Sequence, residues 1–556
     1  MNTFSAKSVY FKMFISRILP MLGFALVLGF SLPAHAQNNN FTNAATANWS
    51  TASAWSLGVP TSAQDAYHTN SSVAINVTTS AQAKSLTIGG SGGTASVVTF
   101  ANHSLIVGGD ITLASGAGTG ELRLSGANST VTLNAGNGSI LNGGGFGSAT
   151  MNVQGGFSNS VGLLNASVDN MNLGATGNGT LVITNGQTYT VSTTLGLASA
   201  ASTGNTGTIL MNGGALISSS SSASQGIRLN SGAAAANNAS LILNSGATVT
   251  AQTIIRANSG TDAAIHWNDG TIGNYAGTNL TISAAAGAGT MNINLARTGT
   301  HTFNAESGRT ITVAATAQLQ DKSGEAGTLN KAGGGTLLLP GANTYSGATT
   351  ISGGTLMLST NGAIASSSLL SVASGATLDV AAVASGFRIG ANQILQGSGT
   401  VIGNTTIEGS LKPGNSPGLL TFNNDLTLAG ASSTVMEFLG AEVRGTDYDA
   451  VNVGGLLTYD GSLTLDFGAT FAQGSYNFNL FDFNNQSGFY DNISLSGDYS
   501  GSFTRNGTDW ELSSGNETWN FSQSTGELSL NVIPEPSSLS LLLLGTVVWL
   551  RQRRRA

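Results

Sequence analysis

The sequence predicts an all-β protein, a right-handed parallel β-helix in which each coil of the chain stacks on the preceding one. Short runs with period-2 alternation of apolar and polar residues recur along the chain. Gly, Asn and Ser corners separate them, and no ten-residue amphipathic helix intervenes. Two Gly-Thr-Leu strands, Gly335–Leu339 and Gly354–Leu358, begin about 20 residues apart, the length of one coil. Two or three β-sandwiches are the competing interpretation.

The composition fits a stack of coils and excludes several other classes. Only 8% of the 556 residues are charged, while 76 are glycine and 40% are hydrophobic. Small polar residues can align between coils without charge repulsion, and glycine suits the tight corners. The absence of cysteine excludes disulfides, thiolate metal sites and cysteine catalysis. A net charge of −7 argues against nucleic acid as a partner.

Residues 1–36 have the features of a secretory signal peptide, which implies Sec-type export machinery as a partner. The basic residues Lys7, Lys12 and Arg17 precede an apolar run at 18–30. A small-residue cleavage site follows at Ala34 and Ala36, so the mature chain is expected to start at Gln37. An uncleaved membrane anchor is the alternative.

Residues 37–72 are predicted to cap the first coil. Trp49 and Trp55 precede Gly58, Pro60 and Asp65, an arrangement that resembles the entry segment of secreted repeat proteins. Two indoles can cover the apolar end of a coil, which would otherwise expose its core and strand edges. The alternative is a tryptophan pair that stacks on sugars.

Residues 73–327 are predicted to form irregular coils. Corners such as Asn185–Gly186 and Asn212–Gly213 should supply positive φ angles. The clearest predicted strands are 84–88, 104–107, 110–113, 121–124, 130–133, 179–183, 240–243 and 310–313.

Residues 328–419 contain the most regular coils and a recognisable pattern. The residues that form this pattern are Leu329, Lys331, Gly333, Gly335, Thr336, Leu337, Leu339, Gly341, Asn343, Tyr345, Gly347, Thr349, Ile351, Gly354, Thr355, Leu356 and Leu358. With these residues, the segment 329–358 resembles the autotransporter-associated β-strand repeat, which implies an exported β-helical protein and a structural, not catalytic, pattern.

A later Pro-Gly-rich run is predicted to be an external loop, because Pro413 and Pro417 cannot donate ladder hydrogen bonds.

Residues 420–532 are rich in aromatic and acidic residues and are predicted to be final coils with a sandwich-like C-terminal cap. Asp447 and Asp449 stand two residues apart, and Glu442 or Asp460 could add oxygen ligands for calcium. An exposed turn is the competing interpretation, because no full calcium-loop motif is present. No other cofactor is expected.

The segment 533–556 combines three unlike parts in one order: Pro534–Glu535–Pro536, an apolar run at 539–550, and a basic end. It resembles the PEP-CTERM sorting signal, which implies transient anchoring in the inner membrane of a Gram-negative bacterium and processing by an exosortase. As a short transmembrane helix, the run would rise about 18 Å, less than a hydrocarbon core of about 30 Å. An ordinary tail anchor is the alternative. The basic residues are Arg551, Arg553, Arg554 and Arg555.

No catalytic group stands out in the sequence. His266 and Asp269, with Asp262 nearby, could perform acid–base chemistry on a polysaccharide, but Asn-Asp-Gly is also an ordinary corner. His301, Glu306 and Arg309 are scattered in the same way. We therefore expect a non-enzymatic, exported protein of the cell envelope or extracellular matrix, structural or adhesive, with exopolysaccharide as a partner. A polysaccharide lyase, a hydrolase or a glycan-binding protein on the same scaffold is the alternative.

Overall fold

The computed structural model describes residues 37–534 with short gaps, together with Trp549. The gaps are 44, 70–73, 90–94, 102, 108–110, 114–118, 126–129, 134–138, 143–148, 154–155, 158–164, 174–178, 199–204, 221, 223–224, 233–235 and 261. The coils all belong to one compact unit, which begins at Asn38.

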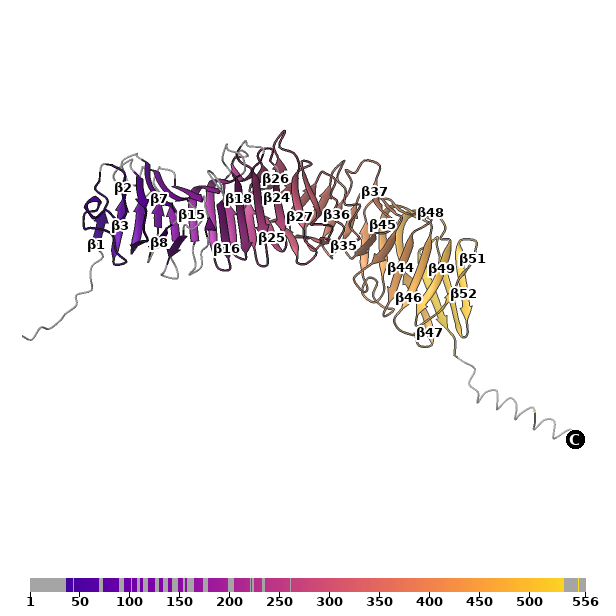
Figure 1. Cartoon of the computed structure of the whole chain (residues 1–556). Helices are drawn as coiled ribbons and strands as arrows, with labels where there is room; N and C mark the ends of the chain where they lie inside the picture. Colours follow the sequence, from indigo (N-terminus) through magenta and orange to yellow (C-terminus); the bar gives the residue numbers. More distant parts are fainter. Residues whose placement is uncertain are drawn as a thin grey trace, which may run out of the picture. The chain divides into compact units, whose positions relative to one another are not determined.

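Three faces of parallel strands make up the coils, and each strand pairs with its counterpart in the next coil (Figure 1). The first face consists of β3 (Gln64–His68), β6 (Ser85–Ile88), β9 (Ile111–Leu113), β12 (Ser139–Asn142), the first parts of β15 (Asn165–Leu173) and β17 (Thr188–Leu197), β19 (Ala215–Ser218), β22 (Thr248–Ala251), β25 (Gly270–Asn274), β28 (His301–Asn304), β31 (Leu329–Ala332), β33 (Thr349–Ile351), β35 (Leu369–Val372), β38 (Ile394–Gly397), β41 (Ser410–Pro413), β44 (Ser433–Phe438), β46 (Ser462–Phe467) and β49 (Asn492–Gly497).

The second face follows the first along each coil. It consists of β2 (Ala47–Asn48), β4 (Ala74–Val77), β7 (Ala95–Ala101), β10 (Thr119–Ser125), β13 (Ala149–Val153), the later parts of β15 and β17, β20 (Gly226–Leu229), β23 (Thr253–Arg256), β26 (Leu280–Ala284), β29 (Thr310–Val313), β32 (Thr336–Leu339), β34 (Thr355–Leu358), β36 (Thr377–Asp379), β39 (Thr400–Ile402), β42 (Leu419–Phe422), and the first parts of β45 (Ala450–Tyr459) and β48 (Phe481–Gly488).

The third face is interrupted. Its strands are β5 (Ala81–Ala83), β8 (Ser104–Val107), β11 (Thr130–Leu133), β14 (Gly156–Phe157), β16 (Gly179–Thr184), β18 (Thr206–Asn212), β21 (Asn238–Leu243), β24 (Asp262–Trp267), β27 (Met291–Leu295), β30 (Ala317–Asp321), β37 (Phe387–Ile389), β40 (Thr405–Ile407), β43 (Leu426–Leu428) and the later parts of β45 and β48. Between β30 and β37, this side of the coil is made of loops.

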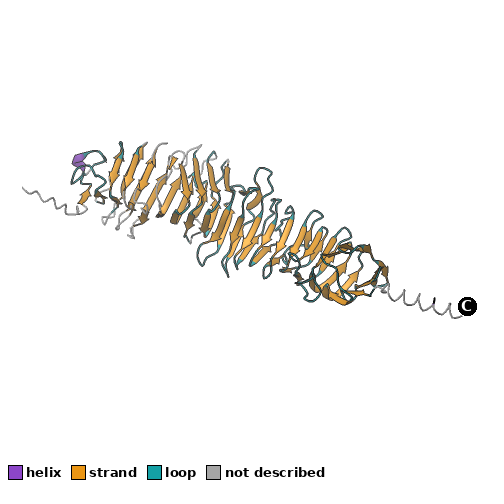
Figure 2. Ribbon diagram, turned by 90° about the horizontal axis from the view of Figure 1, so that it is seen from below, coloured by secondary structure: helices purple, strands orange, loops and turns teal. Residues whose placement is uncertain are grey.

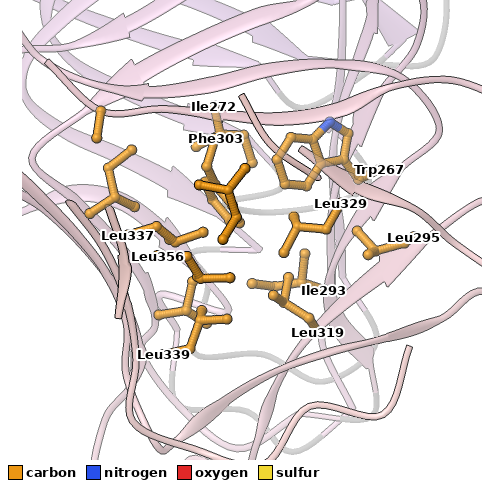
Figure 3. Packing of buried hydrophobic residues seen from close by; sticks show 14 of the residues in the cluster. Trp267, Ile272, Ile293, Leu295, Phe303, Leu319, Leu329, Leu337, Leu339 and Leu356 are labelled. Atoms are coloured by element: carbon orange, nitrogen blue, oxygen red, sulfur yellow. The ribbon is translucent and has the colours of Figure 1, made fainter. Parts of the chain in front are cut away.

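The register between coils aligns apolar residues with apolar residues and threonines with threonines on the second face. Ile311, Leu337 and Leu356 lie over one another, point inward and are fully buried. Leucine, isoleucine and aromatic side chains from all three faces meet in this shared core, as Figure 3 shows around Phe303 and Trp267. The neighbouring outward position on the second face is a column of threonines, namely Thr310, Thr336, Thr355, Thr377, Thr400 and Thr421. Uncharged columns of this kind let coils stack at strand spacing without repulsion, as the composition predicts.

The parallel pairing confirms the predicted all-β coil and is inconsistent with the alternative of antiparallel β-sandwiches for residues 73–419. Its right-handedness stays a prediction. Coils vary in length, because one turn advances the chain from Leu395 to Leu411 and another from Leu216 to Val249. The predicted external loop is partly wrong: Pro413 ends strand β41, and the loop starts only after it. Pro413 is the last residue of β41 and lies beyond the residues that pair with β38 and β44, so its missing N–H costs no recorded ladder bond.

Aromatic residues close the first coils. Trp49 and Trp55 are 1% and 4% exposed, their ring centroids lie 4.9 Å apart, and Phe41 packs edge-on against Trp55. A short 3₁₀ helix, η1 (Ala52–Ala54), connects the two tryptophans and is the purple element in Figure 2. This packing leaves neither indole face free to stack on a sugar, and the capping role of residues 37–72 stays a prediction.

An antiparallel sheet follows the last coils. It contains β47 (Gly474–Asn479), β54 (Glu527–Val532), β53 (Glu517–Ser522), β52 (Asp509–Ser514) and β51 (Thr504–Asn506), and the short β50 (Gly501–Ser502) pairs antiparallel with β49. Phe467 of β46 packs against Trp519 of β53, with centroids 5.0 Å apart. Residues 420–532 thus contain parallel coils up to β49 and, beyond β46, an antiparallel sheet. Their assignment as one separate region stays a prediction.

Two predicted targeting segments fall largely outside the described residues. Ala34 and Ala36 precede the described part, which starts at Gln37, and Glu535, Pro536 and the four arginines follow Pro534. Within the described residues, no helix has the length and apolarity needed to cross a bilayer. The C-terminal membrane helix and the sorting signal therefore stay predictions.

Candidate functional site

Lys331, a residue of the repeat pattern, lies in the core and not on the surface. It stands between Phe303 and Ile351 on the first face and is fully buried. Its ammonium group donates to the carbonyl oxygens of Ala332, Gly333 and Gly353 at 2.8, 2.9 and 3.0 Å. The three N–H donors of a lysine are thereby all used within the corner. Burial lowers the pKa of Lys331 to about 8.

The glycines of the pattern serve the same corner. Gly333 has φ +76°, and a Cβ atom at this position would collide with the carbonyl oxygen of Ala305 in the preceding coil. Only glycine combines this backbone conformation with so close an approach. The carbonyl groups that Lys331 binds are therefore placed by glycine corners.

Asn343 replaces strand pairing on the side where the third face is interrupted. Its Oδ1 accepts a hydrogen bond from the Leu319 N–H at 3.0 Å. Its Nδ2 donates to the carbonyls of Gly341 and Ala363 at 3.0 and 3.3 Å. One amide side chain thus joins the coil before it to the coil after it, and it is 5% exposed.

Tyr345 starts a buried chain of hydroxyl groups. Its Oη lies 2.7 Å from Thr349 Oγ1, which lies 2.8 Å from Ser367 Oγ, and Ser367 donates to the Gly347 carbonyl at 2.8 Å. Tyr345 is fully buried, and burial raises its pKa. Lys331, Asn343 and Tyr345 are therefore structural: they are buried, and their polar groups bond to backbone or to a neighbouring hydroxyl.

The predicted histidine–carboxylate cluster does not converge. His266 lies on the third face, half-buried, beside Asn294. His301 lies on the first face, fully buried, with Nδ1 2.7 Å from the Thr328 carbonyl oxygen. Asp269 Oδ1 accepts from the N–H groups of Gly270 and Thr300 at 2.7 and 3.0 Å, which is the corner interpretation. Burial lowers the pKa of both histidines.

The aspartates proposed for calcium point to different places. Asp447 Oδ2 accepts from the N–H groups of Glu442 and Val443 at 3.0 and 2.9 Å, so it closes its own exposed turn. Asp449 is buried, 3% exposed, and bonds elsewhere. Within the described part of the chain, no three acidic, histidine or cysteine side chains are grouped closely enough to hold a metal ion.

A cleft of about 290 Å³ opens next to Asp449. Its floor is formed by outward side chains of successive coils on the first face: Gln396 of β38 is aligned with Lys412 of β41, and Glu437 of β44 with Asp466 of β46. Its remaining lining residues are Pro413, Gly414, Asn415, Ser416, Val435 and Asp449.

The wall of the cleft is a strained but anchored turn at residues 414–418. Gly414 and Gly397 exchange two backbone hydrogen bonds of 2.7 and 3.0 Å, which join the turn to the preceding coil. Ser416 has φ +81°, a conformation that costs a non-glycine residue roughly 1–3 kcal/mol. Such strain persists only where the surrounding structure holds the backbone in place.

Asp449 connects this turn to the floor. Its Oδ1 accepts from the Gly418 N–H at 2.7 Å and its Oδ2 from the Glu437 N–H at 2.9 Å. Burial raises the pKa of Asp449 to about 7, and the two N–H donors oppose that shift only in part. Asp466 accepts from Ser496 Oγ at 2.7 Å.

Sequence reasoning identified Asp449 and the Pro-Gly-rich run but missed Lys412, Glu437 and Asp466. Each of the three is a charged residue at an outward position of a strand with period-2 alternation. That signal was present in the sequence. The sequence did not indicate that the three residues lie close together, because their positions depend on the lengths of the intervening coils.

The fold and these sites define a parallel β-solenoid whose recognisable motif is structural. A family model, the passenger-associated-transport-repeat, matches residues 329–358, the coil around Lys331 and Tyr345. This finding confirms the resemblance predicted for that segment and indicates a passenger-like domain of an exported or cell-surface protein. No curated protein matches the chain.

Proposed function

We propose that this chain is an exported, non-enzymatic β-solenoid that serves as a structural or adhesive component of the cell envelope or extracellular matrix. The observation that carries the proposal is the use of the repeat residues. Lys331 and Asn343 use their polar groups on backbone, and Tyr345 uses its hydroxyl on that of Thr349, within the core. A coil of this kind is a stable, disulfide-free scaffold, because backbone ladders and a continuous core supply its stability.

Export is proposed to start at the signal peptide and to end at the C-terminal segment. Sec-type machinery would carry the chain across the inner membrane, with cleavage before Gln37. The segment from Pro534 would hold the chain there until an exosortase-like peptidase releases it. Its basic end would stay cytoplasmic, because arginines near a membrane segment favour the inside.

The sorting half of the proposal is tested by replacing Pro534, Glu535 and Pro536 with alanine. We expect the protein to accumulate in the inner-membrane fraction with its C-terminal segment uncleaved, as judged by fractionation and intact mass. A matched control replaces Pro413 and Pro417, outside the segment, and should leave processing unchanged. Unaltered location and mass in the triple variant would refute sorting by this segment.

One observation favours a second candidate, a hydrolase or lyase that acts on polysaccharide. A carboxyl group with a raised pKa beside a second carboxylate, as at Asp449 and Glu437, is the pairing that acid–base chemistry requires. Incubation of the purified protein with neutral and acidic glycans distinguishes the two candidates. We expect no product; product formation that Asp449→Asn abolishes would replace the first candidate with the second.

A further inference from the structure

The cleft beside Asp449 has a mixed lining of donors and acceptors. Lys412 is exposed and forms no salt bridge with any described residue. The Glu437 carboxylate has no hydrogen-bond partner among the described residues, although its backbone N–H binds Asp449. Gln396 and Asn415 add amides that can both donate and accept. These groups are turned toward solvent in a hollow, and the fold does not use them.

Asp449 retains acceptor capacity toward the same hollow. A carboxylate offers about four lone-pair positions, and the two backbone donors occupy only two of them. Glu437 and Asp466 face each other on adjacent coils, where like charges are destabilising. A ligand that donates hydrogen bonds to both carboxylates would relieve that repulsion.

The charges limit the chemistry of the ligand. A phosphate or uronate would be repelled by the carboxylates of Glu437 and Asp466, while a diamine would be repelled by the ammonium group of Lys412. A molecule with closely spaced hydroxyl groups can donate to the carboxylates and accept from Lys412 and the amides at the same time. The volume of about 290 Å³ is at the small end of the range for small-molecule sites.

We propose that this cleft binds a short segment of an uncharged polysaccharide, which lies across the coils from Gln396 past Lys412 and Glu437 to Asp466. Gln396 is aligned with Lys412, and Glu437 with Asp466, on neighbouring coils about 4.8 Å apart. Between these pairs the row shifts along β44, because Leu411 is aligned with Thr434 and Lys412 therefore lies beside Val435. The anchored turn at 414–418 holds one edge of the ligand. This binding site would give the adhesive role a ligand, and its biological setting rests on the proposed function. Sugar binding itself can be measured on the purified protein, independently of export.

Binding is tested by calorimetry on the purified exported protein with cellohexaose, laminarihexaose and maltohexaose as neutral probes. A galacturonate hexamer and a glucosamine hexamer serve as the acidic and the basic probe. We expect at least one neutral probe to bind more tightly than both charged ones. Lys412→Met and Glu437→Gln should each weaken that binding by roughly tenfold or more, because each removes a charged partner.

Glu408→Gln is the matched control, since it removes a partly exposed carboxylate between β40 and β41 that is paired with Arg388 outside the cleft. It should change affinity less than twofold. A second measurement uses only the unmodified protein: the neutral probe should slow hydrogen exchange at residues 412–418 and 435–437. Tightest binding of a charged probe, no binding of any neutral probe, protection confined to other coils, or equal affinities of all variants would each overturn the proposal. If the protein fractionates as the sorting proposal expects but binds no sugar, only the proposal of a binding cleft is refuted.

Discussion

The coils around Lys331 and Asp449 each bury an ionisable side chain, and they do so with opposite results. Around Lys331, three carbonyl oxygens take all three N–H donors, and the side chain lies between Phe303 and Ile351. Around Asp449, two backbone N–H groups take half of the acceptor capacity, and a cleft lies on the other side.

The difference shows that a buried charge is not by itself a functional signal. What matters is whether the backbone uses every donor or acceptor of the group, and whether there is space beside it. Lys331 fails both conditions for a binding group and is structural. Asp449 meets both, although it also connects the turn at 414–418 to β44.

The largest effect is expected from Lys331→Met. The substitution keeps an apolar stem but leaves the carbonyls of Gly333 and Gly353 without a described donor, while that of Ala332 keeps only the Ala305 N–H. This loss should cost about 3–5 kcal/mol of local stability. Because coils of a solenoid can open separately, the measurement is hydrogen exchange across residues 329–358 and not a global melting curve.

Lys412→Met is the control for that experiment, since Lys412 is exposed and makes no salt bridge among the described residues. Its effect on exchange in the same coils should be under about 0.5 kcal/mol. If the two methionine variants behaved alike, the ammonium of Lys331 would not be holding its corner.

The next effect is a dependence of stability on pH that is tied to Asp449. Its pKa of about 7 in the folded chain exceeds the ordinary value of 3.8 because of burial. Between these two pH values the folded state binds the extra proton, so its stability should fall as pH rises from about 4 to 7. The change is at most about 4 kcal/mol. Exchange protection at 412–418 and 435–437, measured across this pH range, should decline accordingly, and Asp449→Asn should remove the slope.

Lys331 should produce the opposite slope at higher pH. Its pKa of about 8 is below the ordinary 10.5, again because of burial. The unfolded chain then binds more protons between these values, so stability of the 329–358 coil should rise from pH 8 to 10.5. A flat profile for this coil, or the same sign as for the Asp449 coil, would contradict the comparison.

The smallest effect is expected from Tyr345→Phe. The ring stays in place, but the buried hydroxyl chain through Thr349 to Ser367 loses its first member. Removing one such bond should cost about 1 kcal/mol. Hydrogen exchange at residues 345–367 checks this value, and a loss as large as that of Lys331→Met would mean that the ring, not the hydroxyl, was disturbed.

Much of the solenoid follows from local patterns. Strands β8, β11 and β29 begin and end where the alternating runs at 104–107, 130–133 and 310–313 predict. Gly186 and Gly213 have the positive φ angles expected of Asn-Gly corners, 79° and 98°. The pattern Leu-x-Lys was recognisable, yet the inward position of Lys331 was not expected, because a charged side chain ordinarily faces solvent.

By itself, the sequence determined that this chain forms parallel coils, because alternation within a strand and glycine at a corner act over a few residues. Only the tertiary structure decided which outward residues meet. Coils of unequal length bring Lys412, Glu437 and Asp466 to one cleft beside Asp449, although these residues are far apart along the chain. Contact between coils is set by the sum of every strand and loop between them, and no local pattern contains that sum.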